Sequence, residues 1–506
     1  MKKHLNKFSI VLFVVVCFAG LVLILNFYLK KELKDSMGDQ LSGASVGYEE
    51  IQVSIIKDQV TIAKPNWKVG KYFIQTEKIL IKDLSFFDYF FNKRIVIGEI
   101  DISNPEVIFN ENDSVQNISK KNKNLHFEKE IVVKKFNVKG GCLIIKEKEP
   151  VSNKLYFSIK ELKLHEILIN SKTLLGTLPF EYQSGVIESD SVFYELDEAH
   201  NIILKNLKLK DGDFAVKDFR IIPKYNKAGF DRRISVEKDR FELGLNSIKI
   251  KGLDWGIKND SLYLFAPVTH ISGADFKVYR NKLLPDDTSI KPLFSEMIRE
   301  LAIKIKFDTI FIRASQVEYE EKMIATSFPG KVGFYDLRGE VVNISNMGMK
   351  AKDFLKTKIH VETRFMNEAN LILNLEFDTR NLQDEFRVSG NMASISAGAM
   401  NSFLTPVSNV EVEGEIESLY FNFQGNKYIA NGDMRLKYNN FKVEVLKKDG
   451  TGKNKLLSGL ANLLVKKEAN SKKLEKKGVE AVRDRTKSFW NFLWLFIRNG
   501  ALKSFL

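Results

Sequence analysis

The feature that most constrains the fold of this chain is the alternation of apolar and polar residues along much of its length. A period of two is typical of a half-buried β-strand, because successive side chains point to opposite faces. Helical spacing is scarce between Tyr48 and Lys447, apart from a short helix expected around 292–301. We therefore predict a long β body over residues 48–447. The clearest alternation is shown by Leu301, Ile303, Ile305 and Phe307, and by Leu371, Leu373, Leu375 and Phe377.

The spacing between successive apolar residues along this body is repeatedly three instead of two, which we call a slip of the apolar phase. Examples are the steps from Ile159 to Leu162, from Val216 to Phe219 and from Ile416 to Leu419. A slip of this kind sends later side chains to the other face of the sheet unless a bulge or turn intervenes. The pattern therefore predicts a sheet that twists and is bulged many times. No Pro/Ser-rich linker divides the body into independent domains.

An uncharged hydrophobic run covers residues 8–29, with lysines on both sides. At about 1.5 Å of rise per residue, this run crosses the ~30 Å hydrocarbon core of a bilayer as one helix. A cleaved secretory signal has a shorter apolar core and a small-residue cleavage site close behind it. Here Lys30 and Lys31 follow instead, which favours an uncleaved anchor and leaves the cleaved signal as the alternative. We predict a cytoplasmic tail at 1–7, a transmembrane helix at 8–29 and a polar juxtamembrane linker at 30–47.

The formal net charge of +14 is spread as lysines that alternate with apolar residues, and it thickens near the C-terminus. A nucleic-acid binder usually concentrates such charge on one arm or helix, so we expect no nucleic-acid partner. The excess of positive charge indicates either a solvated face or an affinity for anionic lipid head groups. The two cysteines, Cys17 and Cys142, exclude a disulfide framework.

After Lys447 the period changes, and residues 448–506 are predicted to form a helical, basic and aromatic tail. Its last part reads as an amphipathic helix with Trp490, Trp494 and Ile497 on one side and Phe496 beside them. Tryptophan and phenylalanine next to a basic segment suit a membrane interface. The alternative is a helix docked against its own body, and the sequence leaves both open.

No enzyme signature is found, and we expect no catalytic residue, cofactor or metal site. Residues 43–47 match the G-x-S-x-G pattern around Ser45, but that motif needs a strand before it and a helix after it. A polar linker precedes Ser45 and a predicted strand follows. His165 and Glu166 begin like a zinc-binding motif, but Ile169 stands where the second histidine is required.

An N-terminal anchor, a short polar piece and a very long alternating β body resemble the AsmA-like proteins of Gram-negative envelopes. Residues 98–107, in which a strand leads into Asn104-Pro105-Glu106-Val107, look like an early segment of that family. Residues 412–416, followed by Gly425, Gly432, Tyr438 and the stretch 456–462, look like its closing strands and the helix after them.

The resemblance implies a mainly β fold: a long, twisted, repeatedly bulged antiparallel sheet that forms an elongated groove or half-pipe. It also implies an inner-membrane protein with its body in the periplasm, similar to bridge-like lipid-transfer proteins. The groove would bind phospholipid acyl chains and support their transport between the inner and outer membranes, or envelope homeostasis. The candidate lipid-facing positions are the eight apolar residues of the two alternating stretches.

Two readings compete with this one. An ordinary β-sandwich shows the same alternation, with its apolar faces packed on each other. A non-transport scaffold or assembly factor for outer-membrane biogenesis would need a dry core and a protein partner in the envelope. Alternation alone does not separate an open groove from a closed core.

Overall fold

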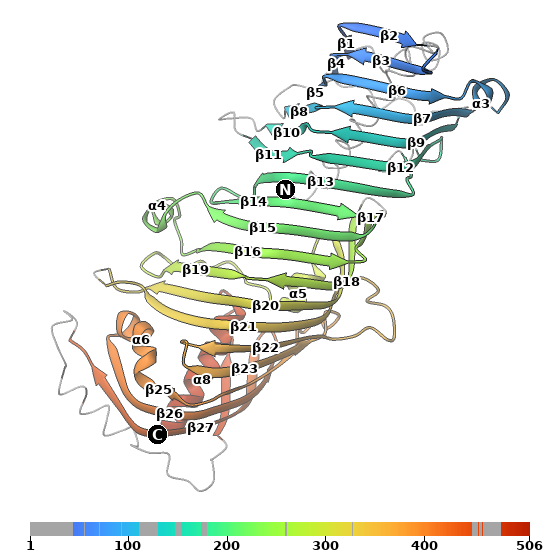
Figure 1. Cartoon of the computed structure of the whole chain (residues 1–506). Coiled ribbons are helices and arrows are strands. Elements are labelled where there is room, and N and C mark those ends of the chain that lie inside the picture. Colours follow the sequence, from blue (N-terminus) through green and yellow to red (C-terminus); the bar gives the residue numbers. More distant parts are fainter. Residues whose placement is uncertain are drawn as a thin grey trace. The chain divides into compact units, whose positions relative to one another are not determined.

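The computed structural model describes residues 44–54, 56–69, 71–92, 94–110, 130–146, 153–173, 180–258, 261–325, 327–447, 454, 458 and 477–505 (Figure 1). The predicted tail at 1–7, the predicted anchor at 8–29 and most of the predicted linker lie outside these residues. In the described part of the chain, no helix is both long enough and apolar enough to cross a bilayer.

The fold is mainly β, and the chain divides into two compact units. The first unit comprises Met1–Asp218 and Gly252–Tyr263. The second comprises Phe219–Lys251 and Leu264–Leu506. Two strands, β15 (Asp213–Pro223) and β18 (Ser261–Ser272), cross the boundaries between these segments. Each unit is described separately below.

Within its described residues, the first unit is a mixed sheet with one short helix, α3 (Phe86–Phe91). Its other strands are β1 (Ala44–Gly47), β2 (Glu50–Ser54), β3 (Gln59–Ala63), β4 (Asn66–Val69), β5 (Tyr72–Gln75), β6 (Lys78–Leu84), β7 (Arg94–Ser103), β8 (Glu106–Asn110), β9 (Glu130–Lys139), β10 (Cys142–Lys146), β11 (Asn153–Ser158), β12 (Glu161–Ile169), β13 (Ser184–Glu195), β14 (His200–Lys210) and β17 (Asp254–Lys258).

In the segment from β1 to β12, each odd-numbered strand and the strand after it are the two arms of one bent strand. Both arms keep the same register with the neighbouring bent strand. In the strand formed by β7 and β8, Arg94 lies opposite Glu130 and Glu106 lies opposite Cys142, so the offset is 36 positions on both sides of the bend. Hydrogen bonding also continues through the bends, since the amide of Asn104 donates to the Lys139 carbonyl at 2.8 Å. The bends therefore line up across the sheet.

Residues with a left-handed backbone make these bends. Lys64 and Asn104 have φ of 42° and 51°, and Gly140 and Gly141 have φ of 72° and 96°. A Cβ on Gly141 would lie 2.3 Å from the Pro105 carbonyl oxygen, so only glycine fits there. The segment Asn104-Pro105 thus lies at a bend of the sheet.

The predicted slips of the apolar phase are confirmed as bulges or bends. Ile159 lies at the bend between β11 and β12, and Asp218, inside the slip from Val216 to Phe219, has φ of 56°. The register shifts between Ile416 and Ser418. Asn and Asp tolerate positive φ better than other non-glycine residues, which explains their presence at such sites. The slips keep apolar side chains on one face, where the first unit has a core that includes Ile97, Ile100, Val133 and Phe136.

The second unit is also a mixed sheet, with helices beside it. Its helices are α4 (Lys227–Asp231), α5 (Phe294–Arg299), the 3₁₀ turn η2 (Ala397–Met400), α6 (Asn401–Ser408) and α8 (Phe489–Phe505). Its other strands are β16 (Asp239–Lys251), β19 (Asp275–Asn281), β20 (Lys304–Lys322), β21 (Gly330–Ser345), β22 (Thr357–Phe365), β23 (Ala369–Phe377), β24 (Phe386–Met392), β25 (Ile395–Ser396), β26 (Val410–Gly425), β27 (Ile429–Val445) and β28 (Lys477–Val482).

Strands β20 to β28 of this unit form an antiparallel meander. β18 and β19 are two arms of a bent strand, and both pair antiparallel with β16. The pair β19–β20 is parallel, as are β7–β9 and β8–β10 in the first unit. The predicted mainly β, repeatedly bulged sheet is confirmed, but the prediction that it is wholly antiparallel is wrong.

Two predicted boundaries also need correction. The first strand begins at Ala44, so the last four residues of the predicted linker 30–47 belong to the sheet. Strand β28 lies inside residues 448–506, which we predicted to be a helical tail, whereas α8 and the helical residue Ser458 agree with that prediction. The expected short helix near 292–301 is present as α5.

Candidate functional site

The apolar side chains of the second unit line up in rows that run across its strands. One row, read from the strand registers, passes from Ile310 on β20 to Val479 on β28. Its members are Ile310, Val341, Ile359, Leu375, Val388, Phe423, Gly432 and Val479. We call the sheet face that carries this row the inner face. Residues directly opposite each other on paired strands point to the same face of the sheet, so the row lies on one face.

A second row extends the inner face to the strands on the other side of β20. Phe334 on β21 and Phe365 on β22 are cross-strand neighbours, with ring centroids 5.4 Å apart. The members of this row are Leu243, Phe276, Val317, Phe334, Phe365 and Ala369. At about 4.8 Å per strand, six strands separate its two ends by roughly 24 Å.

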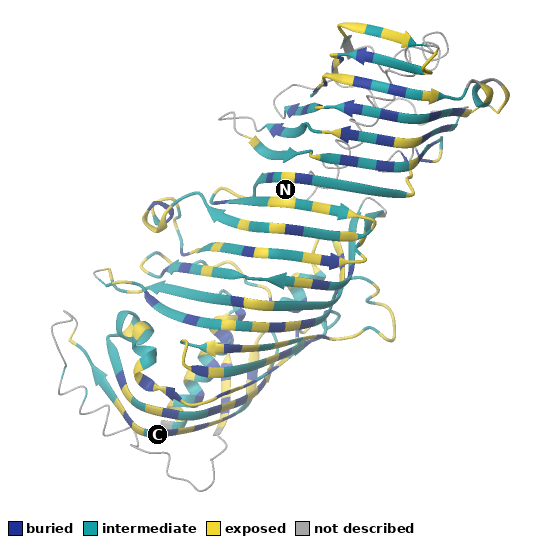
Figure 2. Ribbon diagram, in the orientation of Figure 1, coloured by how far each residue is buried: buried dark blue, intermediate teal, exposed yellow. Residues whose placement is uncertain are grey.

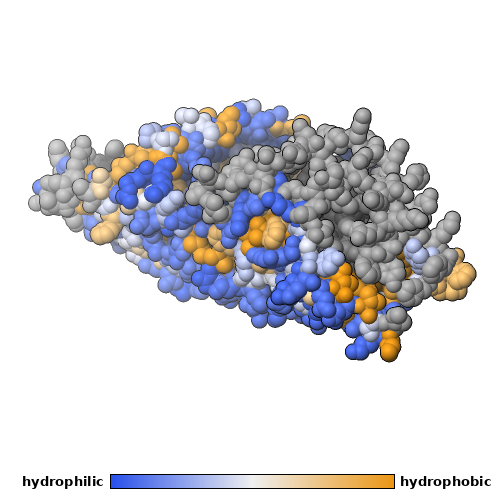
Figure 3. Space-filling view, turned by 90° about the horizontal axis from the view of Figure 1, so that it is seen from above, coloured by the Kyte–Doolittle hydropathy of each residue, from blue (hydrophilic) through white to orange (hydrophobic). Residues whose placement is uncertain are grey.

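Exposure changes along the inner face. Leu243, Phe276, Ile310 and Val317 are half-buried, and the packed core of the unit includes none of them. Toward β28 the side chains become fully buried, and Val388 and Phe423 are each 1% exposed. Figure 2 shows buried and exposed residues alternating along the strands, and the face seen in Figure 3 carries separate hydrophobic patches bordered by hydrophilic side chains.

Helices cover the buried part of the inner face. The ring of Phe496 on α8 lies 4.1 Å from that of Phe423, measured between centroids, and Phe489 meets Phe386 edge-on at 5.2 Å. Phe294 and Ile298 of α5 and Leu404 of α6 pack against the same core. In this part of the second unit, the inner face is therefore the wall of a closed core.

The predicted lipid-facing residues fall on both parts of the inner face. Leu375 and Phe377 are each 4% exposed and lie in the closed core, and Leu371 and Leu373 pack against it. Ile305, 9% exposed, and the half-buried Phe307 lie on β20. Leu301 and Ile303 precede this strand, which begins at Lys304, so the prediction that they are strand positions is wrong. These residues lie instead in the turn that follows α5.

The C-terminal helix is docked on the body, as one of our two alternatives held, but it also exposes tryptophans. Trp490 and Trp494 are 55% and 47% exposed. Ile497 is partly buried against the core. Phe496 is 2% exposed, so the prediction that it faces a membrane interface is wrong: α8 points this ring at the sheet.

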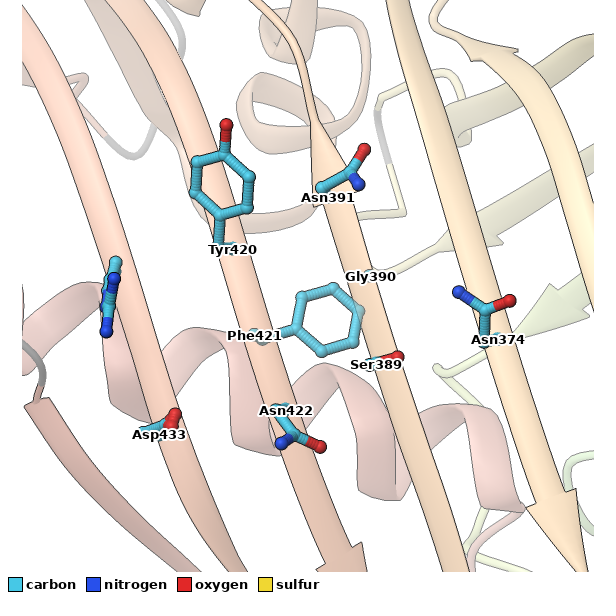
Figure 4. Close-up of a pocket in the computed structure, with 9 residues that line it drawn as sticks. Asn374, Ser389, Gly390, Asn391, Tyr420, Phe421, Asn422 and Asp433 are labelled. Atoms are coloured by element: carbon cyan, nitrogen blue, oxygen red, sulfur yellow. The ribbon is translucent and has the colours of Figure 1, made fainter.

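The opposite face of the same strands is polar. Asn374, Ser389, Asn422 and Asp433 form a cross-strand row directly beside the apolar row of Leu375 and Phe423. They line a shallow depression of about 300 Å³ together with Tyr420 (Figure 4). His360 extends the polar row, since its Nδ1 lies 2.8 Å from Asn374 Oδ1. This arrangement suits a solvated surface.

A buried ionic cluster joins the segment before α8 to the start of β16. Glu237, whose side chain is 2% exposed, accepts a hydrogen bond from Lys487 Nζ at 2.8 Å and pairs with Lys282. Burial alone would raise the pKa of Glu237, but the hydrogen bonds and positive charges of these two lysines lower it below its ordinary value. Close by, Arg483 donates to the Lys291 carbonyl and the Lys291 amide donates to the Arg485 carbonyl. The cluster fixes where α8 begins.

Helix α8 also protects the last strand of the meander. Within the described residues, β28 pairs with β27 alone. Asn499 Nδ2 donates to the Glu480 carbonyl at 3.3 Å, and Lys503 Nζ donates to the Gly478 carbonyl at 2.9 Å. Side chains of the helix thus satisfy acceptors of an edge strand that another strand could otherwise use.

The weak catalytic candidates lie in ordinary strands. Ser45 is on β1 opposite Lys68, and a second strand follows it, so the strand–turn–helix setting of a nucleophile elbow is not found there. His165 and Glu166 lie on β12, where Glu166 has φ of 50°. Among the described residues, no group of three or more His, Cys, Asp or Glu side chains is placed to hold a metal ion.

Sequence reasoning left the docking of α8 open, and it missed the cover of the inner face by α5 and α6 and the Glu237 cluster. The spacing of Phe489, Phe492 and Phe496, all at most 5% exposed, was the available signal for the docked side of α8. Nothing local marks Glu237, because its partner Lys487 is 250 residues away. Comparison with protein-family models and with curated proteins found no match.

Proposed function

We propose that this protein binds lipid acyl chains along the half-buried part of the inner face and supports phospholipid transport between the inner and outer membranes, or envelope homeostasis. The observation that carries the proposal is the row from Leu243 through Phe276 to Val317 and Phe334, which offers apolar surface that no packed core uses. An acyl chain needs contact with such a surface and no specific hydrogen bond.

The same proposal includes the predicted setting of the chain. It is an AsmA-like, single-pass protein of the inner membrane, with the anchor at 8–29, the N-terminus in the cytoplasm and the body in the periplasm. It is not an enzyme, and its partners are phospholipids and an outer-membrane or envelope protein. The apolar run, the alternation and the resemblance of residues 98–107 support this setting.

Photo-crosslinking with a matched pair of neighbouring positions tests lipid binding. Leu243 lies on the inner face of β16, and Glu242 points to the opposite face, where it lies opposite Lys277. A photoreactive amino acid at position 243 of the full chain should give a phospholipid adduct in mass spectrometry. The same group at position 242 should give none. Equal labelling at both positions, or no adduct at 243 in protein from cells, would refute the proposal.

The closed core under α8 favours the second candidate, a non-transport scaffold or assembly factor. Leu375, Phe377 and Phe423 are buried beneath helices, as a purely structural sheet requires. This candidate predicts protein released from cells without bound phospholipid, and protein partners recovered by crosslinking. Native mass spectrometry of the full chain decides between the two, because bound phospholipid supports carriage and lipid-free protein supports the scaffold.

A further inference from the structure

One group of turns in the second unit gathers exposed apolar side chains and cations. We call it the turn patch and define it by Leu382, Lys427, Tyr428, Ile429, Val482 and Arg485. Its apolar members are unusually exposed: Leu382 68%, Tyr428 49%, Ile429 43% and Val482 74%. Single exposed apolar residues are common, but a gathered set marks an interaction site.

Hydrogen bonds and strand pairing hold these residues together although they come from three segments. Lys427 Nζ donates to the Leu382 carbonyl at 2.8 Å, which joins the β26–β27 turn to the β23–β24 turn. Ile429 pairs with Val482 across β27 and β28. The Asn426 side chain accepts from the amides of Tyr428 and Ile429, so the turn itself is fixed. The patch is therefore a preformed surface.

Two cations flank the aromatic ring at its centre. Lys427 Nζ and Arg485 Cζ lie 5.6 Å and 5.4 Å from the centroid of Tyr428. Glu385 and Asp484 lie near patch residues in sequence and keep their negative charges, because their bound donors, Asn381 and Thr486, are neutral. At the Tyr428 ring itself, the patch offers two cations beside protruding apolar side chains.

We propose that the turn patch docks onto the surface of an anionic phospholipid bilayer. Tyrosine between cations suits the head-group level of a membrane, where apolar tips enter the acyl boundary and basic groups meet lipid phosphates. A protein partner needs a larger contact, because a standard interface uses about 20–30 residues on each side. The docking is independent of acyl-chain binding on the inner face.

Two leucines of similar exposure provide a test variant and its control. Leu382 lies in the patch. Leu502, 53% exposed, lies near the far end of α8, whose 17 residues span about 25 Å. Phe489 at the start of α8 packs on Phe386, which follows the β23–β24 turn, whereas Lys503 at its end bonds to Gly478 at the start of β28. Leu382→Asp therefore changes the patch, and Leu502→Asp makes the same change away from it.

Vesicle capture measures the docking with the full chain. The protein is reconstituted into sucrose-loaded phosphatidylcholine vesicles, which are pelleted with separate fluorescent vesicles that contain phosphatidylglycerol. We expect wild type and Leu502→Asp to pellet the fluorescent vesicles, and Leu382→Asp to pellet about tenfold fewer. Lys427→Gln should weaken capture by about fivefold, and vesicles of phosphatidylcholine alone should be captured poorly.

Several results would overturn the proposal: full capture by Leu382→Asp, an equal loss in Leu502→Asp, or capture that ignores phosphatidylglycerol. Capture that needs the same protein in both vesicle populations would assign the patch to a second copy of the chain instead. Circular dichroism checks that each variant is folded. The crosslink at position 243 should persist in Leu382→Asp, which keeps this test separate from that of lipid binding.

Discussion

At the scale of single residues, the Glu237 cluster shows how a buried charge places a distant helix. Glu237 is almost fully buried, pairs with Lys282 and Lys487, and lies 4.0 Å from the more distant Arg280. Breaking a buried ion pair typically costs about 3–5 kcal/mol, and loss of Lys487 would leave the Glu237 carboxylate with Lys282 as its one close cation among those pairs. The cluster is therefore a sensitive point in the second unit.

We predict that Lys487→Ala lowers the free energy of unfolding by about 3 kcal/mol, measured by urea denaturation. Lys358→Ala is the matched control, because the Lys358 side chain is 64% exposed and pairs with Glu376 at 3.9 Å. An exposed pair of this kind contributes at most about 1 kcal/mol. Equal losses in the two variants would contradict a special role for the cluster.

The Glu237 cluster also predicts a pH dependence. Because the pKa of Glu237 is lowered in the folded state, its contribution to stability is present above the unfolded value of 4.5 and is lost as the pH falls through the folded value. Wild type should therefore lose more stability than Glu237→Gln when the pH is lowered from neutral to below that window. Parallel pH profiles for the two proteins, measured by denaturation, would count against this prediction.

At the scale of elements, α8 covers part of the inner face and also hydrogen-bonds to carbonyls of the edge strand β28. Phe496→Ala should cost about 3–5 kcal/mol, because the ring is buried on Phe423 and leaves a cavity when it is removed. Hydrogen exchange should rise across the amides of 489–505. Trp494→Ala, which removes a half-exposed ring, should cost clearly less. Similar exchange in both variants would show that Phe496 does not hold the helix.

At the scale of the whole molecule, two cores share no residues. Ile97, Ile100 and Phe136 belong to the first unit, and Phe423 and Phe496 belong to the second. We predict that Ile97→Ala, a cavity mutation in a fully buried site, speeds hydrogen exchange in β6, β7 and β9. Exchange in β24, β26 and β27 should stay unchanged. Faster exchange in both sets would mean that the units unfold as one.

Much of this architecture could be predicted from periodicity. Alternation at Leu371–Phe377 identified a strand, and the three-residue slips identified bulges, because both signals are local. The parallel pairs could not be foreseen, since the pairing of Arg94 with Glu130 depends on how distant segments meet. The burial of Phe496 and the closed core around Leu375 could not be predicted from the sequence either. An apolar face looks the same in the sequence whether acyl chains or helices cover it.

The hydrogen bonds from Asn499 and Lys503 to the carbonyls of β28 bear on growth of the sheet. An uncapped edge can recruit another strand and so lengthen a sheet from copy to copy. In the second unit, two side chains of α8 occupy carbonyl acceptors of β28. These bonds oppose the addition of a further strand at this edge, so the chain itself disfavours growth of the sheet from one copy to the next.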